Sequence, residues 1–349
     1  MNDRLNPLAC IAAAAIVVLS SAPAWVAAQA PSAPAASAGA KPSTPAAKPA
    51  TAPAKPWTLQ RTPFGQPDLQ GYWTSLSFTP LERPEKFGTR EFLTDREVEE
   101  IFKAGVQHSY EFTFANSAET PVYDATVYSL DAWQNGVRPN KRTSLIVDPP
   151  NGRLPPMTPA GQARRGRGGR GGAEQQTFNG PEDLGMGVRC FTFGGPPIPA
   201  GSNYNQNTFI LQGKDHVVIE YEWGSVTRVI PLDKRPHLSG NIRPWRGDSR
   251  GRWEGNTLVV ETTNFRPGAA PAGSNPATVR MTERLSRIDE NTIEYKYTVD
   301  DPSTWTRPWT AIIPLSKVDG PLFEYACHEG NNGLVNILEG ARAQEKQAR

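Results

Sequence analysis

Short segments in which apolar and polar side chains alternate fill the chain from about residue 205 onward. In residues 292–300, every second residue is Ile, Tyr or Val, and the residues between them are polar. A period of two is typical of a strand with one buried face. Residues 208–211 and 216–221 flank a Gly-Lys-Asp turn in the manner of a hairpin. Further strands are predicted over 143–147, 258–263, 278–288, 309–316 and 321–327.

The turns between these predicted strands are too short for parallel pairing, which needs long crossover connections. We therefore expect a mainly β fold, an antiparallel meander of about eight strands with a long N-terminal loop region and short peripheral helices. Closure of the meander into a barrel would remove its exposed edges and leave room for one small ligand. An open β-sandwich is the alternative fold.

Two helices are predicted outside the sheet. Thr94 and Glu97 have the spacing of a capping box, and Gly105 provides a stop, so we expect a helix over 95–104. A second helix is predicted over 334–344. Its apolar residues would pack on the sheet, namely Leu334, Val335, Ile337, Leu338 and Ala341.

Residues 1–28 have the pattern of a secretory signal peptide. A polar start precedes an apolar run from Leu8 to Leu19, and small side chains suit cleavage after Ala28. An N-terminal membrane anchor is the alternative, but the run has only about a dozen residues, whereas roughly 20 are needed to span a bilayer. We therefore expect an exported protein, periplasmic or secreted, with no membrane span after signal cleavage.

The mature chain is expected to have a disordered linker and one domain. Residues 29–56 are almost entirely Pro, Ala, Ser, Thr, Gly and Lys, which offer too little apolar area to offset the entropy of ordering. Residues 57–349 would form a single β-rich domain with a flexible Arg/Gly insertion at 160–176. That insertion resembles a nucleic-acid-binding tail, but an exported chain with a net charge of +2 gives no reason to expect a nucleic-acid partner. The sequence does not indicate an oligomeric state.

Two of the three cysteines, Cys190 and Cys327, remain after removal of the signal. An even number in an oxidising compartment suggests one disulfide. The loop it closes is long, so it would stabilise the fold by up to ~4 kcal/mol. Two buried thiols are the alternative.

The established catalytic motifs are absent from the sequence, which has no P-loop, no His-Glu-x-x-His, no Cys-x-x-Cys and no Gly-x-Ser-x-Gly. Instead, three loop segments are rich in unusual residues, chiefly Trp, Arg and His. Trp offers a flat apolar face and Arg a planar donor fork, a pair that grips a sugar, an aromatic acid or a carboxylate. The alternative is that the tryptophans close one end of a barrel and the arginines pair with nearby acids.

The first segment spans residues 235–253 and holds two candidate catalytic residues, His237 and Asp248. Its candidate substrate contacts are Arg243, Trp245, Arg250 and Trp253. The second segment spans residues 300–310 and adds the candidate contacts Trp305, Arg307 and Trp309. Adjacent residues of a strand point to opposite faces, so Asp301 is expected to serve a turn rather than act together with Asp300.

The third segment, residues 325–332, places His328 at the mouth of a predicted strand. Histidine titrates near neutral pH, so His328 and the adjacent Glu329 are candidate catalytic residues. Tyr325 and Asn331 are candidate substrate contacts. Two histidines of these loops together with a carboxylate could bind zinc, but nothing in their spacing requires it, so we predict no metal and no cofactor.

Four strings of the sequence are distinctive: PDLQGYW at 67–73, TPLERP at 79–84, DSRGRWEGNTLVVETTNF at 248–265 and VDDPSTWTRPWT at 299–310. They resemble a large group of uncharacterised exported bacterial proteins. This resemblance implies export and a shared fold, but no reaction. The part rich in strands also looks like lipocalin-type barrels, which include ligand carriers and a few hydratases or hydrolases.

We expect an exported enzyme that acts on a small apolar, aromatic or glycosylated molecule by acid–base chemistry, as a lyase, hydratase or hydrolase. In that enzyme His237 and His328 would be acid and base, and Arg243 or Arg250 would stabilise negative charge. A non-catalytic carrier of a small molecule and a structural protein of the cell envelope are the alternatives. An enzyme needs a His or a carboxylate in its main pocket, a carrier needs only an apolar lining, and a structural protein has a filled interior.

Overall fold

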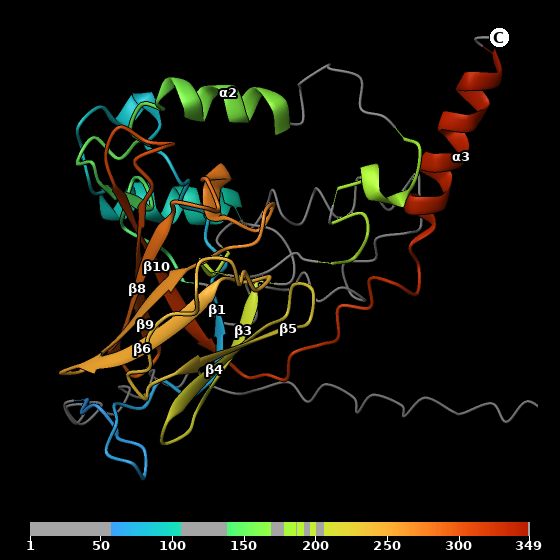
Figure 1. Cartoon of the computed structure of the whole chain (residues 1–349). Coiled ribbons are helices and arrows are strands. Elements are labelled where there is room, and N and C mark those ends of the chain that lie inside the picture. Colours follow the sequence, from blue (N-terminus) through green and yellow to red (C-terminus); the bar gives the residue numbers. More distant parts are fainter. Residues whose placement is uncertain are drawn as a thin grey trace, which may run out of the picture. The chain divides into compact units, whose positions relative to one another are not determined.

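One antiparallel sheet dominates the computed structural model (Figure 1). The structure describes residues 57–105, 138–168, 178–185, 187–191, 196–199 and 206–347, which belong to a unit spanning Lys55–Arg349. The sheet has ten strands, which confirms the predicted mainly β fold. The strands are β1 Gly71–Thr74, β2 Ile146–Asp148, β3 Asn207–Gln212, β4 His216–Tyr221, β5 Val226–Pro231, β6 Asp248–Glu254, β7 Thr257–Thr263, β8 Arg280–Asp289, β9 Thr292–Asp300 and β10 Trp309–Val318.

The strand order joins two meanders through the N-terminal strand. The order is β5-β4-β3-β1-β10-β9-β8-β7-β6, and β2 pairs with β10 off this path. Strand β1 lies between β3 and β10, where Tyr72 is opposite both Phe209 and Val318. The rings of Tyr72 and Phe209 stack with their centroids 4.3 Å apart. The N-terminal region, predicted to be mostly irregular, therefore supplies a central strand of the sheet.

The two outer strands of this order, β5 and β6, are not joined by backbone hydrogen bonds in the described part of the chain. They meet through side chains instead. A Cβ added to Gly251 of β6 would lie 2.9 Å from Ile230 of β5 and 2.7 Å from Leu232. Backbone hydrogen bonds do not close the sheet between β5 and β6. The predicted barrel therefore stays a prediction, and an open β-sandwich fits the same strand order.

One face of the sheet carries the hydrophobic core. Strand β9 has its predicted bounds, and Ile293, Tyr295, Tyr297 and Val299 are all buried, as a period of two requires. The other strands add buried residues to the same cluster, including Ile210, Ile219, Ile230, Val260, Leu285 and Ile313. Full burial of each large aliphatic side chain contributes roughly 1.5–3 kcal/mol to stability, so this core is the main source of stability.

The predicted capping box is present in the helix that follows Thr94. The Thr94 N–H donates to Glu97 Oε2 at 2.8 Å, and the Glu97 N–H donates to Thr94 Oγ1 at 3.3 Å. The helix is described over residues 95–105. The predicted stop at Gly105 borders residues 106–137, which lie outside the described ranges.

The predicted flexible insertion at 160–176 begins with helix α2, Pro159–Gly168. Thr158 caps this helix, since its Oγ1 accepts a hydrogen bond from the Gly161 N–H at 3.0 Å, and proline suits the first helical position. Arg164 Nη2 donates to the Ser303 carbonyl at 3.0 Å. The cap and this anchor explain why a glycine-rich stretch forms a helix. The rest of the insertion, from residue 169, lies outside the described residues.

The C-terminal region differs from its prediction in two ways. Residues 321–327 do not form a strand, because β10 pairs with β1 only as far as Val318 and Pro321 lacks the N–H that a ladder needs. Helix α3, Asn332–Gln347, was predicted to pack on the sheet, but none of its residues is buried. Val335 and Ile337 are 50% and 38% exposed, so that prediction is wrong.

The remaining helical elements are single turns. They are the 3-10 helices η1 Glu85–Phe87, η3 Pro181–Asp183 and η4 Pro271–Gly273. Among the described helices, none combines the length and the hydropathy needed to cross a bilayer.

Candidate functional site

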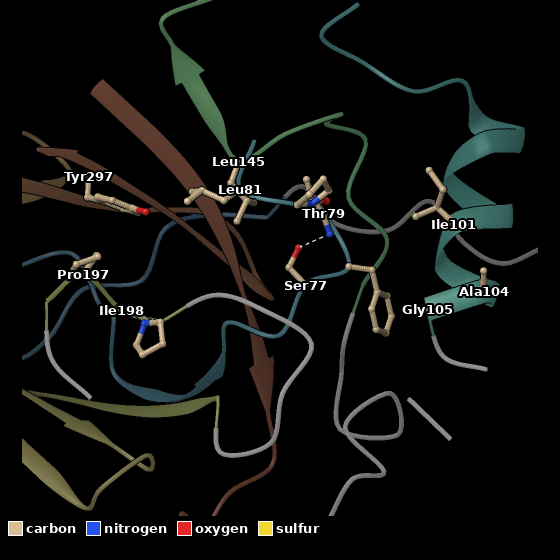
Figure 2. A pocket seen from close by; sticks show the side chains of 13 residues that line it. Ser77, Thr79, Leu81, Ile101, Ala104, Gly105, Leu145, Pro197, Ile198 and Tyr297 are labelled. Atoms are coloured by element: carbon tan, nitrogen blue, oxygen red, sulfur yellow. Dashed lines mark hydrogen bonds between the residues drawn. The ribbon is translucent and has the colours of Figure 1, made fainter. Parts of the chain in front are cut away.

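An apolar pocket lies where five segments of the chain meet (Figure 2). Its volume is about 590 Å³, within the range of about 300–1,000 Å³ that is typical of small-molecule sites. The walls come from the segment after β1, the helix at 95–105, the segment before β2, residues 197–199 and β9. The described lining residues include Ser77, Thr79, Leu81, Ile101, Leu145 and Ile198.

Tyr297 of β9 contributes the one titratable side chain among the described lining residues of this pocket. The residue is 5% exposed, and the Trp309 ring packs edge-on against it at 5.6 Å. The Tyr297 hydroxyl makes no hydrogen bond with a described residue, and burial raises the pKa of the phenol. In Figure 2, Tyr297 lies at one end of the pocket and the helix residues Ile101 and Ala104 lie at the other. The hydroxyl oxygen is not among the fully buried, unpaired polar atoms of the described residues, so it is accessible from the pocket, where a ligand could hydrogen-bond to it.

The pocket wall is tied to a buried ion pair through Tyr295. The Tyr295 hydroxyl accepts a hydrogen bond from the Ile198 N–H at 3.0 Å and donates one to Glu283 Oε1 at 2.8 Å. Glu283 in turn accepts two hydrogen bonds from Arg228, at 3.0 and 2.5 Å. Burial alone would lower the pKa of Arg228, but the attraction of Glu283 raises it, so the guanidinium stays charged. This chain of contacts fixes Ile198 at the edge of the pocket.

Arg228 also connects the two ends of the strand order. It projects from β5, and its Nε donates to Ser249 Oγ of β6 at 2.9 Å. Its Nη2 donates to Thr262 Oγ1 of β7 at 2.8 Å. Because β5 stands at one end of the order and β6 to β8 at the other, the buried faces of the two ends lie against each other.

The structure brings together three of the residues predicted in the first loop segment: His237, Asp248 and Arg250. His237 Nδ1 lies 2.8 Å from Asp248 Oδ2, and Arg250 Nη1 lies 2.6 Å from Asp248 Oδ1. His237 also lines a second, polar pocket of about 260 Å³. The catalytic role of His237 and Asp248 stays a prediction.

The other predicted contacts of that segment line neither pocket. Arg243 is exposed and donates to a carbonyl of its own loop. Trp245 stacks on Phe191 with centroids 5.6 Å apart, and the Arg266 guanidinium lies 3.9 Å from the centre of the Trp245 ring. Trp253 packs against the core from β6. The role of these side chains as substrate contacts stays a prediction.

The tryptophans of the second segment are buried in the core. The rings of Trp305 and Trp309 meet edge to face at 6.4 Å. Trp309 also packs against Tyr297, so it supports the apolar pocket from behind. Arg307 is exposed and forms an ion pair with Asp148 at 2.8 Å. None of the three predicted contacts is among the described lining of either pocket.

Asp301 holds the turn after β9. Its carboxylate accepts hydrogen bonds from the Asn275 N–H at 2.6 Å, from Thr278 Oγ1 at 2.7 Å and from the Thr304 hydroxyl. Burial alone would raise the pKa of Asp301, but these hydrogen bonds, Thr304 foremost, lower it. The carboxylate is therefore ionised at neutral pH and organises the turn, the role that its place in the sequence predicts.

Replacing Asp301 with asparagine should destabilise the protein by about 1–3 kcal/mol at neutral pH, because buried donors lose a charged acceptor. A carboxyl group with a lowered pKa stabilises the fold above its unfolded pKa of about 3.9, and this contribution is lost as the pH falls through the lower folded pKa. The difference between wild type and Asp301→Asn should thus shrink from about pH 7 to about pH 3 in urea unfolding. The exposed neighbour Asp300, changed to asparagine, is the control. An equal difference at both pH values would contradict this account.

A disulfide between Cys190 and Cys327 is present, as predicted, with an S–S distance of 2.07 Å. Two predicted contact residues support the same region. Asn331 Nδ2 donates to the Val188 carbonyl at 2.7 Å, and the Tyr325 N–H donates to a serine hydroxyl at 2.8 Å. The third segment is thus fixed to residues far from it in the sequence.

His328 and Glu329 are exposed in the turn at 327–330, which follows no strand. Among the contacts of the described residues, none joins His328 to His237 or to Asp248. The described residues also contain no group of three or more His, Cys, Asp or Glu that could hold a metal ion. No contact among the described residues therefore supports an acid–base pair of His328 and His237. The absence of a metal stays a prediction.

Sequence reasoning missed Tyr297, Glu283 and Arg228, although each left a signal. Tyr297 occupies an inward position of an alternating strand, where a hydroxyl needs a partner or a ligand. Arg228 and Glu283 replace apolar residues at inward positions of β5 and β8. A charge on the buried face of a strand requires a buried counter-charge, so the two could have been matched to each other.

No protein-family model matches the chain, and no curated protein is similar to it. The resemblance of its motifs to exported bacterial proteins therefore remains a prediction. Function has to be argued from the sites themselves.

Proposed function

We propose that this protein binds a small, mostly apolar molecule that carries one hydrogen-bonding group. One observation carries the proposal: Tyr297 is nearly buried and lines an apolar pocket of about 590 Å³, and its hydroxyl, which is accessible there, has no partner among the described residues. Apolar walls supply affinity, and a single polar group fixes the orientation of the ligand. The ligand would hydrogen-bond to the Tyr297 oxygen and fill the space among Leu81, Leu145 and Ile198.

The lining of this pocket favours binding over acid–base chemistry. Its described residues include no His, Asp, Glu, Lys or Arg. Because burial raises the pKa of Tyr297, the phenol stays protonated at neutral pH and serves as a neutral donor or acceptor. The carrier alternative is therefore the one that the apolar pocket supports, while a structural protein would be expected to fill such a space with side chains.

We also propose that the sheet rolls up, with the pocket at one end of its enclosed face. The contacts of Arg228 support this, because a side chain of β5 reaches β6, β7 and β8 at the far end of the strand order. A rolled sheet provides the interior that lipocalin-type carriers use.

We also propose that the protein is exported from the cytoplasm. The signal pattern of residues 1–28 and the Cys190–Cys327 disulfide both favour a periplasmic or secreted protein, because structural disulfides persist in oxidising compartments.

The neutral fluorescent dye phenylnaphthylamine tests the pocket, because it is apolar and carries one N–H group. We expect saturable binding, and Tyr297→Phe should weaken it about 2- to 10-fold, the worth of one hydrogen bond. The melting temperature should not fall, since Tyr297 gives up no hydrogen bond within the described residues. Tyr295→Phe is the matched variant on the same face of β9: it loses two hydrogen bonds and should lower stability by about 1–3 kcal/mol.

A second test of the proposal fills the pocket with a large side chain. Ala104 lines the pocket, whereas the neighbouring Lys103 on the same helix does not, and both residues are exposed. Ala104→Trp should abolish dye binding, and Lys103→Trp should leave it unchanged. Dye binding that survives both Ala104→Trp and Tyr297→Phe would place the ligand elsewhere and overturn the proposal.

A further inference from the structure

The polar pocket lies beside the contact between His237 and Asp248. Its lining comes from the loop after β5, the end of β7 and the start of β8, and none of the described lining residues is acidic. Arg280 contributes a guanidinium that forms no ion pair with a described residue. Asp300 is opposite Arg280 in the register of β8 and β9, yet the two side chains do not pair. An unpaired cation at the rim of a polar pocket favours a negatively charged ligand.

The contacts of Asp248 determine which nitrogen of His237 is basic. The buried carboxylate pairs with Arg250 and also accepts a hydrogen bond from the Leu238 N–H at 2.8 Å. Because the Asp248 carboxylate is the acceptor in its 2.8 Å hydrogen bond with His237, the donor is the Nδ1–H group of the imidazole. Neutral His237 therefore carries its proton on Nδ1. Nε2 then carries a lone pair and makes no hydrogen bond with a described residue, while the ring is 28% exposed.

The loop that carries His237 is fixed from the opposite side. Asn264 Nδ2 donates to the Leu238 carbonyl at 2.8 Å. Asn264 itself adopts a φ of +55°, a left-handed conformation that asparagine tolerates better than most residues. The imidazole is therefore positioned by the Asp248 carboxylate and by its backbone, an arrangement that suits a general base.

We propose that this pocket is an acid–base site for a small molecule bearing an oxyanion group, in which Arg280 binds the anion and His237 Nε2 accepts a proton. The bond that breaks is an O–H bond of the bound molecule, and its electron pair stays on the oxygen. The bond that forms is Nε2–H, and the positive charge of the imidazolium is offset by the Asp248 carboxylate. Asp248 and Arg250 are positioning residues. This site shares no described residue with the apolar pocket, so it stands independently of the binding function proposed above.

Nitrogen-15 NMR of the full chain labelled in histidine tests the basic nitrogen. Neutral His237 should be the Nδ1–H tautomer, whereas the exposed His216 and His328 should show the ordinary mixture and serve as internal references. Asp248→Asn should shift His237 toward that mixture, a change that a merely structural role for Asp248 would not produce. A neutral His237 protonated at Nε2 would overturn the proposal.

Inorganic phosphate is the probe for the anion, because it offers both an oxyanion and an O–H group. Its addition should shift the His237 ring signals saturably, and Arg280→Gln should weaken this binding about 2- to 5-fold, as expected for an exposed ion pair that solvent screens. Arg280 is exposed, so the fold should persist, which the melting temperature checks. Arg243→Gln, another exposed arginine outside the pocket lining, should leave the affinity unchanged. A shift that does not saturate, or an affinity that Arg280→Gln leaves unchanged, would exclude the site.

Discussion

Replacing Glu283 with glutamine is expected to lower the free energy of unfolding by about 3–5 kcal/mol. Glu283 and Arg228 are almost fully buried and 2.5 Å apart at their closest. Removal of one charge would leave the guanidinium of Arg228 in the core with no counter-charge, which costs far more than the pair itself contributes. Tyr295 would also lose its charged acceptor. Guanidinium unfolding followed by tryptophan fluorescence measures the difference.

Two controls separate the buried charge from general disruption of the sheet. Glu254→Gln removes an exposed carboxylate that pairs with Arg252 and Arg284, and it should change stability little because solvent screens such pairs. The double variant Arg228→Leu with Glu283→Leu removes both charges and should recover most of the loss. If Glu283→Gln were no more destabilising than Glu254→Gln, the ion pair would not be important for stability.

Gly247→Ala should destabilise the protein by about 2–5 kcal/mol, from two effects that add. The φ of Gly247 is +72°, a left-handed conformation that costs other residues roughly 1–2 kcal/mol. A Cβ at this position would also lie 2.8 Å from the Thr263 carbonyl oxygen and 2.7 Å from the Thr262 methyl group. A backbone carbonyl cannot rotate away, and forced overlap in a packed region costs about 1–3 kcal/mol. Thermal and urea unfolding measure the loss.

Gly255 provides the matched control in the turn between β6 and β7. Its φ is +60°, and a Cβ there would meet nothing within 4 Å. Gly255→Ala should therefore show the conformational cost alone, about 1–2 kcal/mol. Similar losses for Gly247→Ala and Gly255→Ala would mean that the close approach of Thr262 and Thr263 has no energetic weight.

Local patterns predicted the strands well and their arrangement less well. Residues 292–300 alternate strictly, and β9 has those bounds. Strand β1 was missed because four residues are too few to show a period; they are held in place by β3 and β10, which lie far away in the sequence. Apolar spacing in 334–344 predicted a helix correctly but did not reveal that its apolar residues would stay outside the core. Packing partners are a property of the whole fold rather than of the segment.

In the candidate sites, too, contacts between residues close in the sequence are easier to predict than contacts between distant segments. His237 lies in the loop before β6, and Asp248 is the first residue of that strand, so their closeness in the sequence makes a contact possible without any distant segment. The apolar pocket has walls from five distant segments, and no local pattern places Ile101 across from Tyr297. At Trp305 and Trp309 composition alone could not decide between the alternatives, because a tryptophan suits the floor of a pocket and the interior of a core equally well.

The bond between Cys190 and Cys327 joins residues 137 positions apart and closes a covalent ring that contains β3 to β10. A single cut by a protease in any loop within this ring would leave every strand attached to the same molecule. Two cuts would be needed to release a fragment. In the extracytoplasmic compartment that we propose, the protein could therefore be nicked once within this ring and still keep all its strands in one molecule.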